Sequence, residues 1–213
     1  MHRGKLKFYY GPMASGKSLQ LLATAYNFQE KGMPFVLIKS EIDDRDGKNV
    51  IHSRALGDRE CITINKDTNL YNMIGRMVTV SMATLTAPLK WVLVDESQFL
   101  TSKQVDELAA VADNLGLNVL CYGLRTDFQT HLFEGTKRLF EIADSLEEIK
   151  SSCECGHKCI FNARVDSDGN IIEEGEQIEI GGNERYVSMC RKCFNEKINS
   201  QYYTDGRGKD SVL

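Results

Sequence analysis

The feature that most constrains the fold is an eight-residue loop, Gly11-Pro-Met-Ala-Ser-Gly-Lys-Ser18, which fits the pattern G-x-x-x-x-G-K-[ST]. Residues 5–10 before it are apolar and aromatic, which predicts a buried strand. Residues 17–31 after it carry apolar side chains at helical spacing and end at a glycine, which predicts a helix. A strand, a loop of this pattern and a helix together form a phosphate-binding unit, so the chain is expected to contain an α/β domain.

Each fixed residue type in the loop has a chemical reason. Gly11 and Gly16 let the backbone bend so that successive N–H groups face phosphate oxygens, and a helix that starts here adds its positive end. Lys17 reaches the outer phosphates, and the hydroxyl of Ser18 can bind Mg²⁺. A chance match in a glycine-containing turn would lack the strand and helix on either side. The predicted phosphate-binding residues are Gly11, Pro12, Met13, Ala14, Ser15, Gly16, Lys17 and Ser18.

The pattern of strands and helices continues along the first 150 residues. Several predicted strands are continuously apolar, which is typical of a parallel sheet covered by helices on both faces. Ser102 is a candidate N-cap. Residues 41–59 are polar and charged, and we expect a long loop there. The predicted strands are residues 34–39, 91–94 and 118–122, and the predicted helices are residues 70–80, 102–115 and 133–143.

The character of the sequence changes near residue 151. Cysteines become frequent, residues 166–170 read as a turn, and residues 177–180 alternate in polarity. We therefore expect a phosphate-binding domain over residues 1–150, a small β-rich metal-binding unit over residues 151–197, and a mobile tail over residues 198–213.

Two carboxylates follow a predicted central strand. The apolar run of residues 91–94 leads directly into Asp95 and Glu96. An acidic residue at the carboxyl end of such a strand is placed to hold Mg²⁺ beside the phosphates, which is the role expected for Asp95. Glu96 would then face the acceptor and take its proton. The alternative is that both are surface carboxylates at the end of a strand.

The cysteines indicate a metal site. The chain has seven, an odd number, and five of them lie in the last third, which favours metal binding over a disulfide framework. Cys153 and Cys155 lie about 35 residues before Cys190 and Cys193, and four thiolates suit tetrahedral Zn²⁺. The gap in the first pair is only one residue, so His157 and Cys159 are rival ligands. Cysteines that are buried without a metal are the remaining alternative.

Composition limits the other functional classes. The net charge of −4 gives no basic footprint for nucleic acid, so no nucleic-acid partner is expected. No apolar run approaches the roughly 20 residues that span a bilayer, and the N-terminus lacks the features of a secretory signal. We therefore expect no membrane partner and a cytoplasmic location.

Taken together, the motifs resemble the cytosolic, zinc-containing thymidine kinase family. The resemblance joins the phosphate loop to Asp95-Glu96-Ser97-Gln98-Phe99, to Gly181-Gly-Asn-Glu-Arg-Tyr186 and to Cys190-Arg-Lys-Cys193, in the order and spacing of the family. It covers residues 4–197. Ala14 departs from animal relatives, which carry a bulkier residue there, but it lies at a variable position of the loop.

The resemblance implies a P-loop (RecA-like) sheet with a zinc-ribbon lid, and transfer of the γ-phosphate of ATP to the 5′-hydroxyl of thymidine or deoxyuridine. It makes Glu96 the proton acceptor, places Asp95 and Gln98 beside ATP, and pairs Asp43 with Arg45 near the phosphates and Mg²⁺. It assigns zinc to Cys153, Cys155, Cys190 and Cys193. The residues that it implies at the thymidine are Met13, Phe99, Leu124, Phe128, Phe133, Gln177, Ile178, Glu179, Ile180, Gly181 and Tyr186.

Several of these roles rest on the resemblance alone. Leu124, Phe128 and Phe133 also read as ordinary core, and Tyr186 as an ordinary strand residue. The family further implies a homotetramer and inhibition by dTTP. The zinc is expected to be structural and to act on substrate affinity only through the loop that it restrains.

Two other functions are compatible with parts of the sequence. One is a P-loop ATPase that acts on DNA, for which Arg125 and Arg138 are the available surface cations. The other is a zinc-ribbon module that binds nucleic acid without catalysis. The acidic balance and the intact phosphate loop argue against both.

Overall fold

The computed structural model describes residues 3–43, 47–53, 55–84, 87–177 and 185–204. The chain divides into two compact units. Unit 1 comprises Met1–Gly11, Gly16–Arg125 and Leu132–Ile149. Unit 2 comprises Pro12–Ser15, Thr126–His131 and Lys150–Leu213. The middle of the phosphate loop therefore groups with the cysteine-rich segment, whereas both ends of the loop belong to unit 1.

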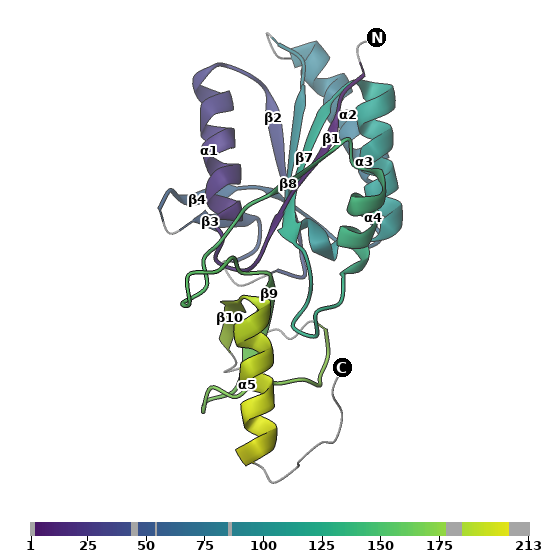
Figure 1. Cartoon of the computed structure of the whole chain (residues 1–213). Coiled ribbons are helices and arrows are strands. Elements are labelled where there is room, and N and C mark those ends of the chain that lie inside the picture. The colour runs from purple at the N-terminus through teal and green to yellow at the C-terminus, as the bar shows by residue number, and fades with distance from the viewer. Residues whose placement is uncertain (1–2, 44–46, 54, 85–86, 178–184, 205–213) are drawn as a thin grey trace. The chain divides into compact units, whose positions relative to one another are not determined.

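Unit 1 is built on a six-stranded sheet whose order is β5-β2-β6-β7-β1-β8, and every strand pairing in it is parallel. This confirms the predicted α/β class. Figure 1 shows α1 on one face of the sheet and α2, α3 and α4 on the other. The strands are β1 (Leu6–Gly11), β2 (Phe35–Ser40), β5 (Ile62–Ile64), β6 (Trp91–Asp95), β7 (Asn118–Leu124) and β8 (Ser145–Glu148), and the helices are α1 (Lys17–Glu30), α2 (Leu70–Thr84), the 3₁₀ helix η1 (Ser97–Phe99), α3 (Ser102–Leu115) and α4 (Glu134–Ile142).

The central strands are apolar on both faces because each face is covered. Along β6, Val92 and Val94 pack into the cluster that includes residues of α2 and α3, whereas Leu93 packs into the cluster that includes residues of α1. Along β7, Val119 and Leu120 separate in the same way. Successive side chains of a strand point to opposite faces of the sheet. Because both faces are buried, every position is apolar, which produces the continuous apolar runs seen in the sequence.

Two local predictions for unit 1 were wrong. Residues 41–59 were expected to form a loop, but β3 (Val50–Ser53) and β4 (Gly57–Glu60) pair there as an antiparallel hairpin. Most of β4 is exposed and polar, so it carries no apolar alternation to reveal it. Ser102 is the first residue of α3, and Thr101 is the N-cap. Thr101 and Gln104 exchange hydrogen bonds as a capping box.

The described residues of unit 2 form a two-stranded antiparallel ribbon and one helix. The ribbon pairs β9 (Phe161–Val165) with β10 (Arg185–Met189), and α5 (Arg191–Thr204) follows directly. The predicted turn is confirmed, because Asp166 accepts hydrogen bonds from the N–H groups of Asp168 and Asn170. Helix α5 continues past residue 198, where the tail was expected to begin; residues 205–213 lie outside the described residues.

Within the part of the chain that the structure describes, no helix combines the length and the apolar character needed to span a membrane.

Candidate nucleotide and metal sites

The phosphate loop bends at Gly16, as its sequence predicts, whereas Gly11 is the last residue of β1 and does not have a positive φ. Gly16 lies in the left-handed region (φ 87°, ψ 21°), and its carbonyl accepts the N–H of Gln20 as α1 begins at Lys17. Ala14 is also left-handed, with φ 56°. In α1, whose residues are all described, no acidic side chain lies in the first turn and no side chain caps its N-terminus. The positive end of the helix is therefore available to an anion.

Lys17 and Ser18 both interact with Asp95, within unit 1. Lys17 and Asp95 are buried, with exposed fractions of 8% and 4%, and the Ser18 hydroxyl hydrogen bonds the Asp95 carboxylate. Burial raises the pKa of Asp95 and the charge of Glu96 raises it further, against the opposing effect of the Glu96 N–H, Ser18 and Lys17. A buried carboxylate next to a hydroxyl is an oxygen donor set that suits Mg²⁺, whose charge would favour the ionised carboxylate.

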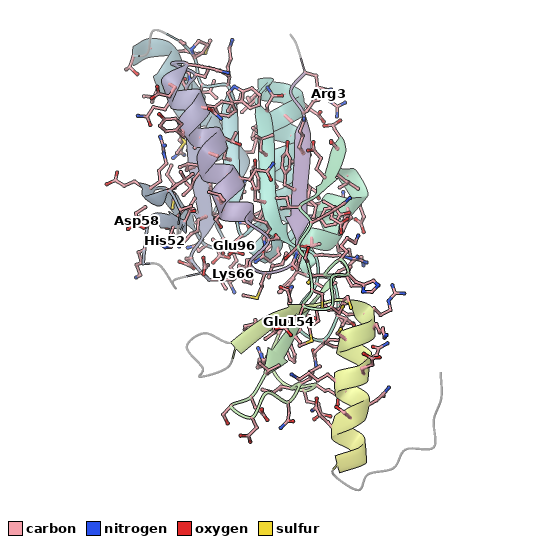
Figure 2. The ribbon with its side chains drawn as sticks, turned by 60° about the vertical axis from the view of Figure 1, so that its left-hand side comes forward. Arg3, His52, Asp58, Lys66, Glu96 and Glu154 are labelled. Atoms are coloured by element: carbon pink, nitrogen blue, oxygen red, sulfur yellow. The ribbon has the colours of Figure 1, made fainter. Side chains whose placement is uncertain are left out.

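Glu96 is held at the end of β6 by its neighbours. It has left-handed backbone angles (φ 48°, ψ 41°), and Figure 2 shows it at the end of the sheet where α1 begins. The side-chain amide of Gln98 donates through Nε2 to the Glu96 carboxylate and accepts the N–H of Leu124 at 2.9 Å through Oε1. Gln98 is buried, so this bridge orients the Glu96 carboxylate from a fixed side chain.

Asp43 has a partner that the sequence did not reveal. Its carboxylate lies 3.7 Å from Nζ of Lys39, and both side chains are buried. Lys39 also donates to the carbonyl groups of Gly47 and Val50. The available signal was a lysine near the end of an apolar strand, in register with Asp95 on β6. Arg45, the expected partner of Asp43, lies outside the described residues.

The residues expected around the base fall in both units. In unit 1, the rings of Phe99 and Phe133 pack edge to face with centroids 5.7 Å apart, and the Leu124 carbonyl accepts the hydroxyl of Thr136. Phe128 and Phe133 are both buried, and burial fits a core role as well as a role at the base. Met13, Phe128, Gln177 and Tyr186 belong to unit 2, and Ile178, Glu179, Ile180 and Gly181 lie outside the described residues.

Contacts within unit 2 hold several of these residues. Gln177 donates to the carboxylate of Asp127 at 2.7 Å. Three further residues were not predicted from the sequence. Asn162 and Ser188 hydrogen bond the backbone of Met13, and Arg164 contacts the side chains of Tyr186 and Phe128. For Asn162 and Arg164, the signal that could have found them is the alternation of polar and apolar residues along β9.

Four of the cysteine side chains lie close together in the structure. The Sγ atoms of Cys153, Cys155, Cys190 and Cys193 all lie within 4.8 Å of one another. Zn–S bonds of about 2.3 Å in a tetrahedron require sulfur atoms about 3.8 Å apart, so this cluster fits structural zinc. Cys159 is buried outside the cluster and donates to the Ser188 carbonyl.

The pKa values within the cluster are split, because hydrogen bonds between the thiols raise the pKa of Cys193 while that of Cys153 is lowered. Hydrogen bonds from the backbone N–H groups of Cys190 and Cys155 lower the pKa of Cys153 to about 6. Burial raises the pKa of Cys159 to about 11, which keeps it a thiol. His157 contacts Cys155 Sγ through Nδ1 at 3.4 Å but is not part of the four-residue cluster. The geometric cluster therefore comprises the four cysteines and includes neither His157 nor Cys159.

A parallel α/β sheet with a glycine loop at the start of α1 and an acidic residue at the end of β6 defines a P-loop nucleotide-binding protein, here with a four-cysteine cluster that could hold a metal. A family model described as thymidine kinase matches residues 4–194. The chain belongs to the thymidine kinase family.

Curated relatives support the same assignment at high coverage. A thymidine kinase of Zymomonas mobilis is 47% identical over 196 residues, which is 92% of this chain and 98% of the relative. A thymidine kinase of Novosphingobium aromaticivorans is 48% identical over 194 residues, with 91% and 98% covered. One of Coxiella burnetii is 47% identical over 190 residues, with 89% and 94% covered.

Proposed function

We propose that this protein is an ATP-dependent deoxynucleoside kinase that phosphorylates thymidine, or deoxyuridine, at the 5′-hydroxyl in pyrimidine deoxynucleotide salvage. The observation that carries the proposal is the fixed carboxylate of Glu96 beside a P-loop and Asp95, in a chain that matches thymidine kinases over nearly its full length. Phosphate binding alone would suit any P-loop NTPase, whereas a positioned base suits transfer to a hydroxyl group.

The phosphate donor is held by the loop and the start of α1. The N–H groups of the loop and the first turn of the helix face the phosphate oxygens, and Lys17 neutralises charge on the transferring group. Ser18 and Asp95 would hold Mg²⁺, which would offset the negative charge of the outer phosphates. Asp43, with Arg45, is proposed to lie on the same side of the nucleotide.

Glu96 takes the proton of the 5′-hydroxyl as the nucleoside oxygen bonds to the γ-phosphorus. The bond between that phosphorus and the β–γ bridging oxygen breaks, and ADP leaves with the electron pair. Gln98 keeps the carboxylate aimed by donating to it. This positioning lowers the entropic cost of assembling base and acceptor.

The nucleoside is proposed to contact an apolar and aromatic wall, with main-chain groups reading the pyrimidine edge. Cytosine presents a donor where thymine presents an acceptor, so it would leave buried groups unpaired and be rejected. The proposed contact residues are Phe99, Leu124 and Phe133 from unit 1, and Met13, Phe128, Tyr186 and the segment from Gln177 to Gly181 from unit 2.

The four-cysteine cluster is proposed to hold structural zinc, because four protein ligands leave no open coordination position for substrate. The family resemblance supports three further proposals: a homotetramer, inhibition by dTTP and a cytoplasmic location.

A substrate panel tests the proposed function. Purified enzyme is incubated with Mg²⁺ and ATP against thymidine, deoxyuridine, deoxycytidine and deoxyadenosine, and the monophosphates are quantified. We expect turnover of thymidine and deoxyuridine, and none with Lys17→Ala, a control that excludes a contaminating host kinase. ATP hydrolysis that responds to DNA and ignores thymidine would instead identify an ATPase acting on DNA.

A further inference from the structure

The β9–β10 ribbon has two chemically different faces. Ala163, Val165 and Met189 point into the small core of unit 2, where they pack with Phe194 and Ile171. The alternate residues form two cross-strand pairs on the other face, Arg164 with Tyr186 and Asn162 with Ser188. Residues directly opposite each other on an antiparallel pair share a face, so these four side chains form one polar surface, which we call the polar face.

One pair on the polar face, Asn162 and Ser188, hydrogen bonds the backbone of the phosphate loop. Oδ1 of Asn162 accepts the N–H of Met13 at 2.7 Å, and the hydroxyl of Ser188 donates to the Met13 carbonyl at 2.7 Å. Nδ2 of Asn162 donates to the carbonyl of Thr126, which sets the amide orientation so that Oδ1 is the acceptor toward Met13. Asn162 is only 2% exposed, so this is a buried and satisfied contact.

These two hydrogen bonds restrain the backbone conformation of the phosphate loop at Met13. With its N–H and its C=O both bound, Met13 cannot rotate without breaking two hydrogen bonds. The next residue, Ala14, has a left-handed backbone (φ 56°) that costs free energy for a residue with a Cβ. The polar face therefore restrains the backbone at Met13, next to the strained backbone of Ala14.

In the other pair, Arg164 contacts two aromatic residues, its cross-strand partner Tyr186 and Phe128. Nε and Nη2 of Arg164 donate to the hydroxyl of Tyr186 at 3.0 and 2.9 Å, and Nη2 also donates to the Glu176 carbonyl at 3.1 Å. The guanidinium carbon lies 3.9 Å from the centre of the Phe128 ring, within cation–π range. Arg164 is 1% exposed, so its charge is solvated by these groups rather than by water.

We propose that the polar face is a positioning platform with two separable parts. Asn162 and Ser188 set the phosphate loop for the phosphate donor, and Arg164 sets Tyr186 and Phe128 for the nucleoside. Because Cys190 directly follows β10, the metal cluster supports both parts and acts on more than the nucleoside loop. The assignment of substrates to the two parts rests on the proposed function.

The first part is tested with Ser188→Val and Ser188→Thr, whose new side chains have the same shape and differ in the hydroxyl. We expect Ser188→Val to raise the KM for ATP about threefold to tenfold, in line with one lost hydrogen bond. Ser188→Thr should stay within twofold of wild type, and zinc content should be unchanged in both. Equal KM values for ATP in the two variants would overturn this part.

The second part is tested with Arg164→Met, Arg164→Lys and Tyr186→Phe. We expect Arg164→Met to raise the KM and the calorimetric Kd for thymidine tenfold or more, while the KM for ATP changes less than twofold. Arg164→Lys should recover part of the loss, and adding Tyr186→Phe to Arg164→Met should cost less than it does in wild type. A loss that affects both substrates equally would contradict a positioning role.

The matched control for this part is Arg59→Met. Arg59 also lies over an aromatic ring, 5.1 Å from the centre of Phe35, but it is in unit 1 and has no part in the proposed site. Its thymidine and ATP constants should remain those of wild type. Zinc content and thermal unfolding of each variant separate a local effect from failure to fold.

Amide hydrogen exchange tests the platform without any substrate. We expect faster exchange at Met13 in Asn162→Ala, and faster exchange over residues 126–131 and 185–189 in Arg164→Lys, with β1 and β6 unchanged. Unchanged exchange at these sites would overturn the platform even in an active enzyme. If wild type fails to phosphorylate thymidine, the proposed function falls, and exchange still decides whether the platform exists.

Discussion

Two residues of the candidate site have backbones that their side chains disfavour. Ala14 and Glu96 are left-handed, and they are two of the four non-glycine residues with positive φ in the described part of the chain. Such conformations cost about 1–3 kcal/mol each and persist only where the surroundings hold them. Hydrogen bonds hold the neighbourhood in both cases: the N–H and the carbonyl of Met13, the residue before Ala14, are both bound, and the side chain of Glu96 is bound by Gln98. The cost is consistent with a site that is built in advance of substrate.

Glu96→Gln is expected to lower kcat by about 100-fold or more, since the side chain keeps its size and its contact with Gln98 but cannot take a proton. Thymidine affinity, measured by calorimetry, should remain within twofold of wild type. Glu60→Gln, an exposed residue of β4, is the control and should behave as wild type. Near-normal turnover in Glu96→Gln would remove Glu96 from the role of base.

The N-cap of α3 gives a prediction about stability at the same scale. Thr101→Ala removes the side-chain acceptor of the capping box and should lower the free energy of unfolding by about 1 kcal/mol. Ser102→Ala leaves the capping box intact and should change it by less than half as much. Urea unfolding followed by circular dichroism measures both, and a larger loss in Ser102→Ala would contradict the structural assignment.

At the scale of elements, the segment that carries Gln98 is positioned by the start of α4. Gly135, in the first turn of that helix, has no side chain, and a Cβ there would lie 2.6 Å from the Ser97 carbonyl oxygen and 2.7 Å from that of Leu100. Backbone atoms cannot move aside as a side chain can. The close approach of α4 therefore fixes η1, and η1 carries the glutamine that orients Glu96.

Gly135→Ala should consequently destabilise the protein by about 1–3 kcal/mol through overpacking and should lower kcat as η1 shifts. Gly75→Ala is the matched control, because Gly75 lies in α2 and a Cβ added there would meet nothing within 4 Å. That change should stabilise the helix by about 0.5–1 kcal/mol. Thermal unfolding and steady-state kinetics of the two variants test the contrast. Equal stability would refute the packing argument.

At the scale of the whole molecule, the two units depend on different forces. Unit 1 has an extensive apolar core on both faces of its sheet, whereas the core formed by the described residues of unit 2 consists of Ile171 and a few side chains from β9, β10 and α5. A core of that size contributes little, and zinc bound by four thiolates contributes roughly 10–16 kcal/mol of apparent binding free energy in small zinc domains. Unit 2 is therefore expected to depend on its metal.

Metal analysis of cysteine variants tests this dependence. Wild type and Cys159→Ser should each hold about one zinc per chain, because Cys159 lies outside the cluster. Cys193→Ser should lose the metal. Hydrogen exchange should then rise over β9, β10 and α5 while β1, β6 and β7 stay protected. Zinc retained in Cys193→Ser, or lost in Cys159→Ser, would contradict the ligand assignment.

The amino-acid sequence by itself determined the local elements of the candidate nucleotide site. The glycines, Lys17 and Ser18 lie in one short loop, and Asp95 and Glu96 follow one apolar strand, so short-range order and periodicity were enough to predict them as candidates. The parallel class of the sheet followed from apolar runs that need cover on both faces. The hairpin of β3 and β4 was not predicted, because the exposed, polar strand β4 has no apolar run or alternation.

Only the tertiary structure decided which distant side chains meet. Spacing left Cys159 and His157 as rivals of the four cysteines, and the folded chain brought together a set that includes neither. The contacts of Asn162 and Ser188 with Met13 span 149 and 175 residues of sequence, and no local pattern records them. The physical reason is that periodicity reports which face of an element is buried, whereas a hydrogen bond between elements depends on their register and packing, which the whole fold sets.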